Sequence, residues 1–141
     1  MHLGSALDEE SRVAAEVEQR ENPRFHWLGP KRHREALETL ARSRLLVVTS
    51  RDEGGPTVVT EAIACGVPVL STETPAATGL LGDDHPGLFP RGDERALAEL
   101  LERCEGDAEF LARLRARSEA AQPSVDPRRE AADLSSLLSE L

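Results

Sequence analysis

The sequence predicts an α/β fold built on a parallel sheet. Short apolar runs alternate with longer stretches of helical periodicity, and this alternation is typical of parallel strands joined by right-handed helical crossovers. Residues 45–48 form a continuous apolar run, as expected of a parallel strand that is buried on both faces. Pro56 and Gly66 stand at the two ends of a helical stretch, which is the usual asymmetry of helix termini.

Five elements are expected before the first long polar loop. They are a strand end at 1–4, a helix at 10–21, a strand at 25–28, a helix at 33–42 and a strand at 45–48. Apolar residues recur at helical spacing in both helices, and Gly29 with Pro30 ends the strand before the second helix. Trp27 is expected to be a core side chain rather than a platform for a nucleotide base.

The second half of the chain continues the alternation. Its expected elements are a helix at 56–65, a strand at 67–71, a short strand at 88–89 and two helices after Glu94. Pro123 and Pro127 then interrupt the chain before a last amphipathic segment. We therefore expect one domain over 1–121 and a helical C-terminal segment over 122–141.

Composition excludes several classes of function. The net charge is -9, from 17 basic and 26 acidic side chains, and an acidic chain without a basic stripe is a poor nucleic-acid binder. No apolar stretch approaches the ~18 residues that span a bilayer and no signal-peptide pattern opens the chain, so we expect a cytoplasmic protein without a membrane span. Cys65 and Cys104 are too few for a disulfide framework or a cysteine zinc site, and Cys65 is expected to be buried.

The segment 48–71 carries the chemistry, because it places a polar, glycine-containing loop between a buried strand and a helix N-terminus. Ligands of open α/β sheets gather outside the carboxyl ends of the strands, where this loop is expected to lie. Gly54 and Gly55 let the backbone approach a ligand closely, and the helix N-terminus offers N–H groups to an anion such as a diphosphate. Glu53 in the loop and Glu61 in the helix supply carboxylates, which accept hydrogen bonds from sugar and ribose hydroxyls.

These residues form a signature that resembles the spaced glutamates of retaining glycosyltransferases with two Rossmann-like domains, the group-1 or family-4 class. The matching residues are Ser50, Glu53, Gly54, Glu61, Ala62, Gly66, Pro68 and Val69. The resemblance extends over about 3–114 and includes the strand end at 27–29 and the segment 89–93. It implies the C-terminal, donor-binding half of a GT-B fold, with a Rossmann-like doubly wound parallel sheet that lacks its first strand and helix.

The roles known in the family carry over onto matching positions. By resemblance, Glu53 faces the donor sugar and is the candidate catalytic residue, and Glu61 holds the ribose. The backbone groups implied to meet the sugar and the diphosphate are those of Gly54, Gly55, Thr57 and Val58. Pro56 has no N–H and only shapes the turn, and 28–31 matches the base-binding loop. The resemblance implies a UDP-sugar donor, no required metal, no cofactor and no protein nucleophile that can be named here.

A narrower resemblance concerns residues 43–50 and 79–84, which are similar to the selenosugar synthases of selenoneine biosynthesis. That subgroup would imply a UDP-sugar donor and selenophosphate as the acceptor. An unspecified sugar transferase is the alternative.

The sequence departs from the family at its start. The Arg/Lys pair that meets the donor phosphates has no match, nor does the N-terminal acceptor-binding domain, so we expect the chain to be inactive alone. The unmatched first strand is central in the usual strand order, and removing it would leave strand edges unpaired. We hypothesise that the strands rearrange or that the open edge pairs with another chain, for example in a homo-oligomer.

Simpler interpretations compete with these assignments. Glu61 would also suit a solvent-facing helix position, and Glu53 would suit a solvated loop or a partner of the helix dipole. Residues 83–85 superficially resemble a metal cluster, but we expect a polar turn there. The rival functions are a two-domain sugar-nucleotide epimerase and a non-catalytic Rossmann-like interaction or structural domain.

Overall fold

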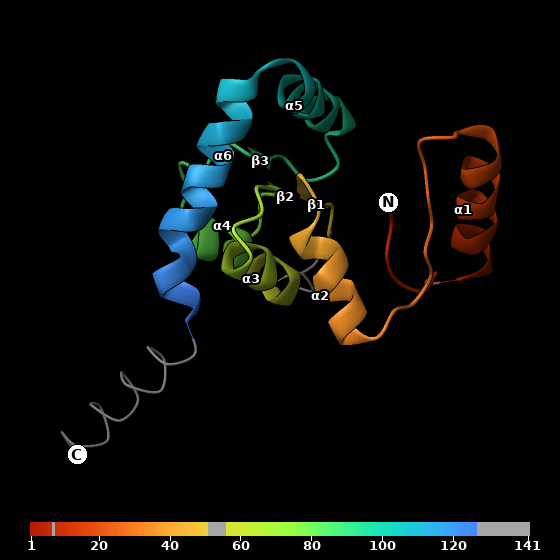
Figure 1. Cartoon of the computed structure of the whole chain (residues 1–141). Helices are drawn as coiled ribbons and strands as arrows, with labels where there is room; N and C mark the ends of the chain where they lie inside the picture. The colour runs from red at the N-terminus through yellow and green to blue at the C-terminus, as the bar shows by residue number, and fades with distance from the viewer. Residues whose placement is uncertain (7, 51–55, 127–141) are drawn as a thin grey trace. The chain divides into compact units, whose positions relative to one another are not determined.

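The computed structural model describes residues 1–6, 8–50 and 56–126 (Figure 1). The chain divides into two compact units, 1–39 and 40–141, and α2 (His33–Ala41) contains the division. The first unit also holds α1 (Glu9–Glu21). The elements of the second unit are β1 (Leu46–Val48), α3 (Pro56–Ala64), β2 (Val69–Thr72), α4 (Pro75–Leu81), β3 (Leu88–Phe89), α5 (Glu94–Gly106), α6 (Ala108–Ala121) and the 3-10 helix η1 (Gln122–Val125). Within the ranges given, no helix is both long and apolar enough to cross a bilayer.

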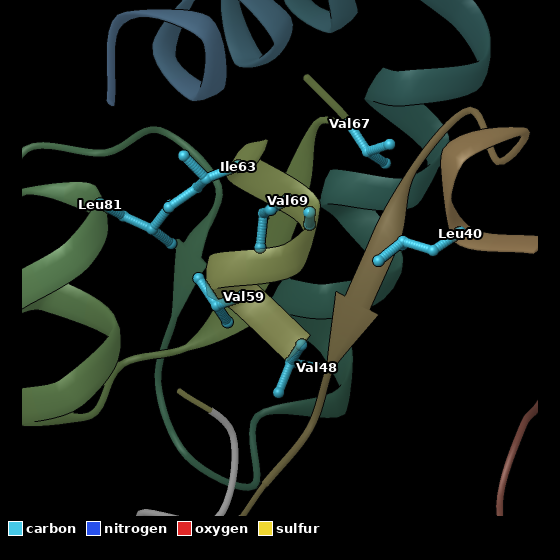
Figure 2. Close-up of a cluster of buried hydrophobic side chains, with 8 residues drawn as sticks. Leu40, Val48, Val59, Ile63, Val67, Val69 and Leu81 are labelled. Carbon is cyan, nitrogen blue, oxygen red and sulfur yellow. The ribbon is translucent and has the colours of Figure 1, made fainter. Parts of the chain in front are cut away.

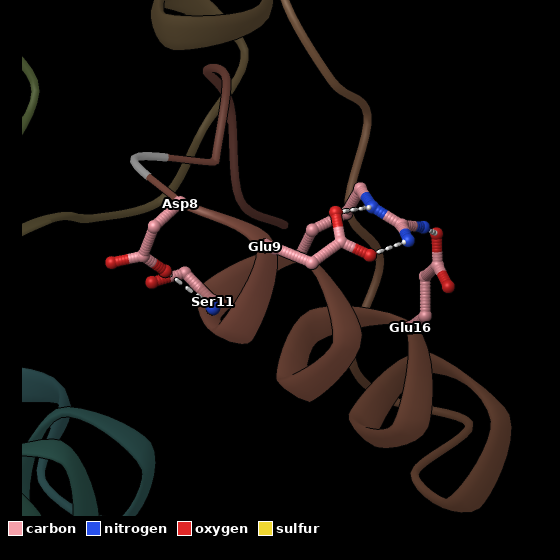
Figure 3. A network of polar contacts seen from close by, with 5 residues as sticks. Asp8, Glu9, Ser11 and Glu16 are labelled. Carbon is pink, nitrogen blue, oxygen red and sulfur yellow. Dashed lines mark hydrogen bonds and ion pairs between the residues drawn. The ribbon is translucent and has the colours of Figure 1, made fainter.

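Helix α1 is held by local polar contacts rather than by a core. The Asp8 carboxylate caps it by accepting from the Ser11 N–H at 2.7 Å, and Arg12 pairs with Glu9 and with Glu16 along the exposed face (Figure 3). No side chain of α1 is buried. The Gln19 side chain also accepts from the Trp27 N–H at 2.7 Å, so α1 is ordered by polar contacts within the helix and by this bond to the segment that follows it.

The two strands predicted in the first unit are reduced to a single parallel bridge between His2 and Trp27. The Trp27 side chain is half-buried, and its Nε1–H donates to the Gly4 carbonyl at 2.9 Å. The indole therefore ties the two extended segments together, which agrees with a structural role although Trp27 is not fully buried.

The sheet of the second unit is parallel and has the order β1-β2-β3. Leu46 pairs with Val69, and Ser71 pairs with Leu88. Every residue of the central strand β2 is buried. The expectation that the run 45–48 is buried on both faces is wrong in one respect, because the Val47 side chain is 38% exposed. Among the described residues no strand pairs with the other edge of β1.

Helices pack on both faces of this sheet. Val69 and Leu70 are neighbours in β2, and their side chains point to opposite faces because strand side chains alternate. Val69 belongs to a cluster formed with α3 and α4 (Figure 2), whose buried members are Leu40, Val48, Val59, Ala62, Ile63, Val67, Val69 and Leu81. Leu70 belongs to a second cluster, formed with α5 and α6, whose buried members are Leu70, Phe89, Cys104, Phe110 and Leu114. The parallel sheet with helices on both faces confirms the predicted fold class.

Most predicted elements are present, and two further corrections concern a helix and a cysteine. Helix α4 was not predicted, although Thr74 caps it by accepting from the Ala77 N–H at 3.2 Å and Pro75 occupies its first turn. Cys65 was predicted to be buried but is exposed, because it follows the last residue of α3 and lies off the inner face of that helix. The amphipathic segment predicted after Pro127 lies outside the described residues.

Candidate functional site

Helix α3, which carries part of the predicted site, is fixed by local sequence at both ends. Pro56 occupies the first helical position. At the other end Gly66 has φ of 66°, and its N–H donates to the Ile63 carbonyl at 3.0 Å. The next N–H, that of Val67, donates to the Ala62 carbonyl at 2.9 Å. These two bonds form a Schellman motif, which needs a left-handed residue and explains the glycine.

The packing of α3 sets the direction of its polar side chains. Val59, Ala62 and Ile63 are at most 2% exposed and face the core. Thr57 and Glu61 are four positions apart, so they share another face of the helix. Thr57 is exposed and Glu61 is half-buried. A rotation of α3 that moved Glu61 would have to expose three core side chains, so the Glu61 position is set by the core.

The first turn of α3 presents backbone N–H groups at the carboxyl edge of the sheet. The N–H groups of Thr57 and Val58 belong to the first turn, whose donors have no intrahelical acceptor. No acidic residue lies in this turn, so no carboxylate within it offsets the partial positive charge of the helix N-terminus. An end of this kind is suited to a phosphate or another anion.

The structure describes three of the six predicted donor-site residues. Thr57, Val58 and Glu61 lie together on α3. Glu53, the candidate catalytic residue, and the two glycines at 54 and 55 lie outside the described residues. The weaker candidates at 28–31 belong to the first unit.

A cavity at the same sheet edge was missed by sequence reasoning. It has a volume of about 300 Å³ and is lined by Thr49, Thr72, Phe89, Gly92, Asp93, Glu94 and Leu97. Each of the three strands ends beside it, and the N-terminus of α5 closes one side. The sequence shows that hydroxyl and carboxylate side chains lie at or after the ends of strands. It does not show that strands far apart in the sequence bring these side chains to one cavity.

The polar turn predicted at 83–85 is present, but His85 is more buried than expected. Asp83 and Asp84 are exposed turn residues, and Asp84 pairs with Arg117 of α6, which lowers the pKa of the Asp84 carboxyl. His85 is 3% exposed, and its Nδ1 accepts from the Gly87 N–H at 3.1 Å. Burial lowers the pKa of His85 to about 4. In the part of the chain that the structure describes, no three His, Cys, Asp or Glu residues are grouped as metal ligands would be.

The fold and the edge geometry together define a class of protein. A parallel α/β sheet with a helix N-terminus at the carboxyl ends of its strands, and no acidic residue in the first turn of that helix, is the arrangement used by nucleotide-binding domains. Residues 4–121 match the family described as glycosyl transferases group 1, and the chain belongs to this family.

Similar proteins agree with this assignment. The chain is 35% identical over 91 residues to the D-inositol 3-phosphate glycosyltransferase of Stackebrandtia nassauensis, a match that covers 64% of this chain and 20% of that protein. It is 25% identical to Anabaena HepE crystallised with UDP-glucose, with a TM-score of 0.76 over 99% of this chain and 40% of the HepE chain. Sucrose-phosphate synthase from Thermosynechococcus elongatus shares the fold, with 21% identity and a TM-score of 0.78. This match covers 98% of this chain and 37% of the synthase chain. The predicted match to GT-B glycosyltransferases is thus confirmed, and the chain spans less than half the length of each of these proteins.

Proposed function

We propose that this chain is the donor-binding part of a retaining glycosyltransferase that uses a UDP-sugar. The observation that carries the proposal is the N-terminal turn of α3, which contains no acidic residue, with Glu61 one turn further along the same helix. Membership of the glycosyltransferase family and the likeness to HepE, whose crystals hold UDP-glucose or UDP, support this choice of ligand.

Each part of the donor is assigned to a chemically matching group. The N–H groups of Thr57 and Val58, with those of the glycines at 54 and 55, bind the diphosphate. Glu61 accepts from the ribose hydroxyls, because an ionised carboxylate is an acceptor only. Glu53 orients the donor sugar. Donors that already point at the diphosphate stabilise the negative charge that develops there as the sugar departs, with no reorganisation during the reaction.

The chain is proposed to be inactive by itself. It has no residue matching the family's Arg/Lys pair, so the leaving diphosphate would lack its main electrostatic partner. The proposed complete enzyme adds an N-terminal acceptor-binding domain to a donor domain at 1–121. Within the described residues, β1 pairs with a strand on one side only. We propose that its other edge pairs with another chain, and measuring the oligomeric state tests this. A cytoplasmic location and the selenosugar subgroup, with selenophosphate as acceptor, stay predictions.

The nucleotide proposal is tested by NMR titration of the 141-residue chain with UDP, GDP and ADP. We expect UDP to perturb the amides of Thr57, Val58 and Glu61 most strongly. Glu61→Ala is expected to weaken UDP binding by roughly ten- to a hundredfold, because one charge-assisted hydrogen bond contributes roughly 1.5–3 kcal/mol. The matched control is Glu102→Ala, which removes an exposed glutamate from α5.

The two outcomes separate the competing functions. Loss of UDP binding in Glu61→Ala alone would support a working ribose site. Equal UDP affinity in both variants, or no nucleotide binding at all, would contradict the donor-site proposal and favour a domain that keeps the fold without the ligand.

A further inference from the structure

A second binding site is indicated by the cavity at the carboxyl ends of the three strands. We propose that this cavity binds a neutral sugar ring, separately from the diphosphate site at α3. The proposal rests on the proposed glycosyltransferase function in one respect only, because that function is the reason for naming a sugar rather than another neutral polyol as the ligand. The binding itself follows from the walls of the cavity.

The cavity has both the polar and the apolar groups that a sugar ring needs. Thr49 follows β1 and Thr72 ends β2, so their side chains bring two hydroxyls to the wall. Phe89, at the end of β3, and Leu97, one turn into α5, supply apolar surface. A sugar ring presents hydroxyls at its edge and C–H groups on its faces, and this cavity offers polar and apolar groups to both.

The hydrogen bonds around Thr72 make this wall rigid. Thr72 is 2% exposed, and its hydroxyl donates to the Val48 carbonyl at 3.2 Å, which ties the end of β1 to the end of β2. The Glu73 N–H donates to the Phe89 carbonyl at 2.8 Å and ties β2 to β3 in the same way. With its proton committed, the Thr72 oxygen can still accept from a ligand hydroxyl. The cavity wall is therefore held in place by the sheet rather than by a loop.

The charge of the cavity selects against phosphates. Among the lining residues that the structure describes, Asp93 and Glu94 are charged and none is basic. The Asp93 carboxylate already accepts from the Ala96 N–H at 2.9 Å, so it occupies the N-terminus of α5 where an anion would otherwise bind. A carboxylate offers about four acceptor positions, so Asp93 can accept from a sugar hydroxyl as well. An incoming phosphate would meet two negative charges.

The volume limits the ligand to about one ring. The cavity of about 300 Å³ lies at the lower end of the roughly 300–1,000 Å³ found for small-molecule sites. A whole nucleotide-sugar does not fit in this space. The site therefore suits one monosaccharide unit.

The proposal is tested by NMR titration of the full chain with three probes: methyl β-glucopyranoside, glucose 6-phosphate and UDP. We expect the methyl glucoside to perturb the amides of Thr72, Gly92 and Asp93, and glucose 6-phosphate to bind there more weakly. Leu97→Trp, which fills the cavity, is expected to weaken glucoside binding by about tenfold or more. Leu101→Trp, one turn further on α5 at a position that is 37% exposed, is the matched control and should bind normally.

A second variant keeps the test decisive if Leu97→Trp fails to fold. Glu94→Arg places a cation at the exposed rim and is expected to reverse the preference in favour of glucose 6-phosphate. The proposal is overturned if the glucoside leaves these amides unchanged or if wild type prefers glucose 6-phosphate. UDP reports on the other site: shifts at Thr57 and Glu61 without glucoside binding would refute the cavity alone, and glucoside binding without UDP shifts would refute the nucleotide proposal alone.

Discussion

Acidification is expected to destabilise the protein through His85. This side chain is 3% exposed and uses Nδ1 to accept the Gly87 N–H, so the neutral ring carries its proton on Nε2. That buried Nε2 has no hydrogen-bond partner among the residues that the structure describes. Burial, and after it the charge of Arg117, lowers the pKa of His85 from 6.5 to about 4, while Asp84 opposes the shift.

The sign and size of the effect follow from this lowered pKa. The folded state binds fewer protons than the unfolded state between pH 6.5 and about 4, so the His85 contribution to stability is complete above pH 6.5 and is lost as the pH falls towards 4. Each unit of pKa difference corresponds to about 1.4 kcal/mol, so the loss reaches about 3 kcal/mol. That is a large part of the roughly 5–15 kcal/mol by which domains are stable.

Urea denaturation across this pH range measures the effect. His85→Asn keeps an oxygen close to the position of Nδ1 to accept the Gly87 N–H but cannot be protonated. On acidification from about pH 7 to about pH 4, we expect wild type to lose about 3 kcal/mol of stability relative to His85→Asn. Titrating groups that do not interact with His85 are common to both proteins, so their contributions cancel. Asp84 and Arg117 interact with the His85 charge, so their coupling to His85 is part of the measured difference. His26→Asn, at an exposed histidine, controls for the loss of a histidine as such. Parallel pH profiles for wild type and His85→Asn would refute the reasoning.

Two further predictions concern the packing and capping of the second unit, and urea denaturation measures both. Gly87→Ala is expected to cost about 1–3 kcal/mol, because its Cβ would lie 2.4 Å from the Val69 carbonyl oxygen, whereas Gly106→Ala meets no atom within 4 Å and should be neutral or slightly stabilising. Equal stability of these two variants would contradict the close packing. Asp107→Ala should cost about 1 kcal/mol, because the Asp107 carboxylate caps α6 by accepting from the Phe110 N–H at 2.9 Å. Asp107→Asn retains an acceptor and should lose much less, so equal losses in the two Asp107 variants would argue against capping.

Local signals explain which elements could be predicted from the sequence. Helix α3 was found because Pro56 and Gly66 mark its ends, and the structure shows the Schellman bonds that require this glycine. Helix α4 has comparable signals in Thr74 and Pro75, but it is only 7 residues long and contains Gly79, so its helical periodicity is weak. The exposure of Val47 depends on what packs against β1, which no local pattern records.

The site shows the same limit. The position of Glu61 on α3 could be predicted, because a helix fixes the spacing of its own residues. The cavity could not, because Thr49, Thr72 and Asp93 become neighbours only through the pairing of β1, β2 and β3. The parallel order of these strands sets that arrangement, and periodicity within any one segment contains no information about it.

The two helix N-termini at this sheet edge differ in charge, and that difference connects the two proposed sites. Both α3 and α5 follow strands of one parallel sheet, so both begin at its carboxyl edge. The first turn of α3 contains no acidic residue, whereas α5 is capped by Asp93 and has Glu94 in its first turn. Within these two first turns, the charge difference agrees with the proposed diphosphate site at the first helix and the proposed neutral-sugar site at the second. The acidic residues at the start of α5 would thus favour an anionic ligand at α3 over α5, and the two proposed sites would hold ligands of different charge on one edge of the sheet.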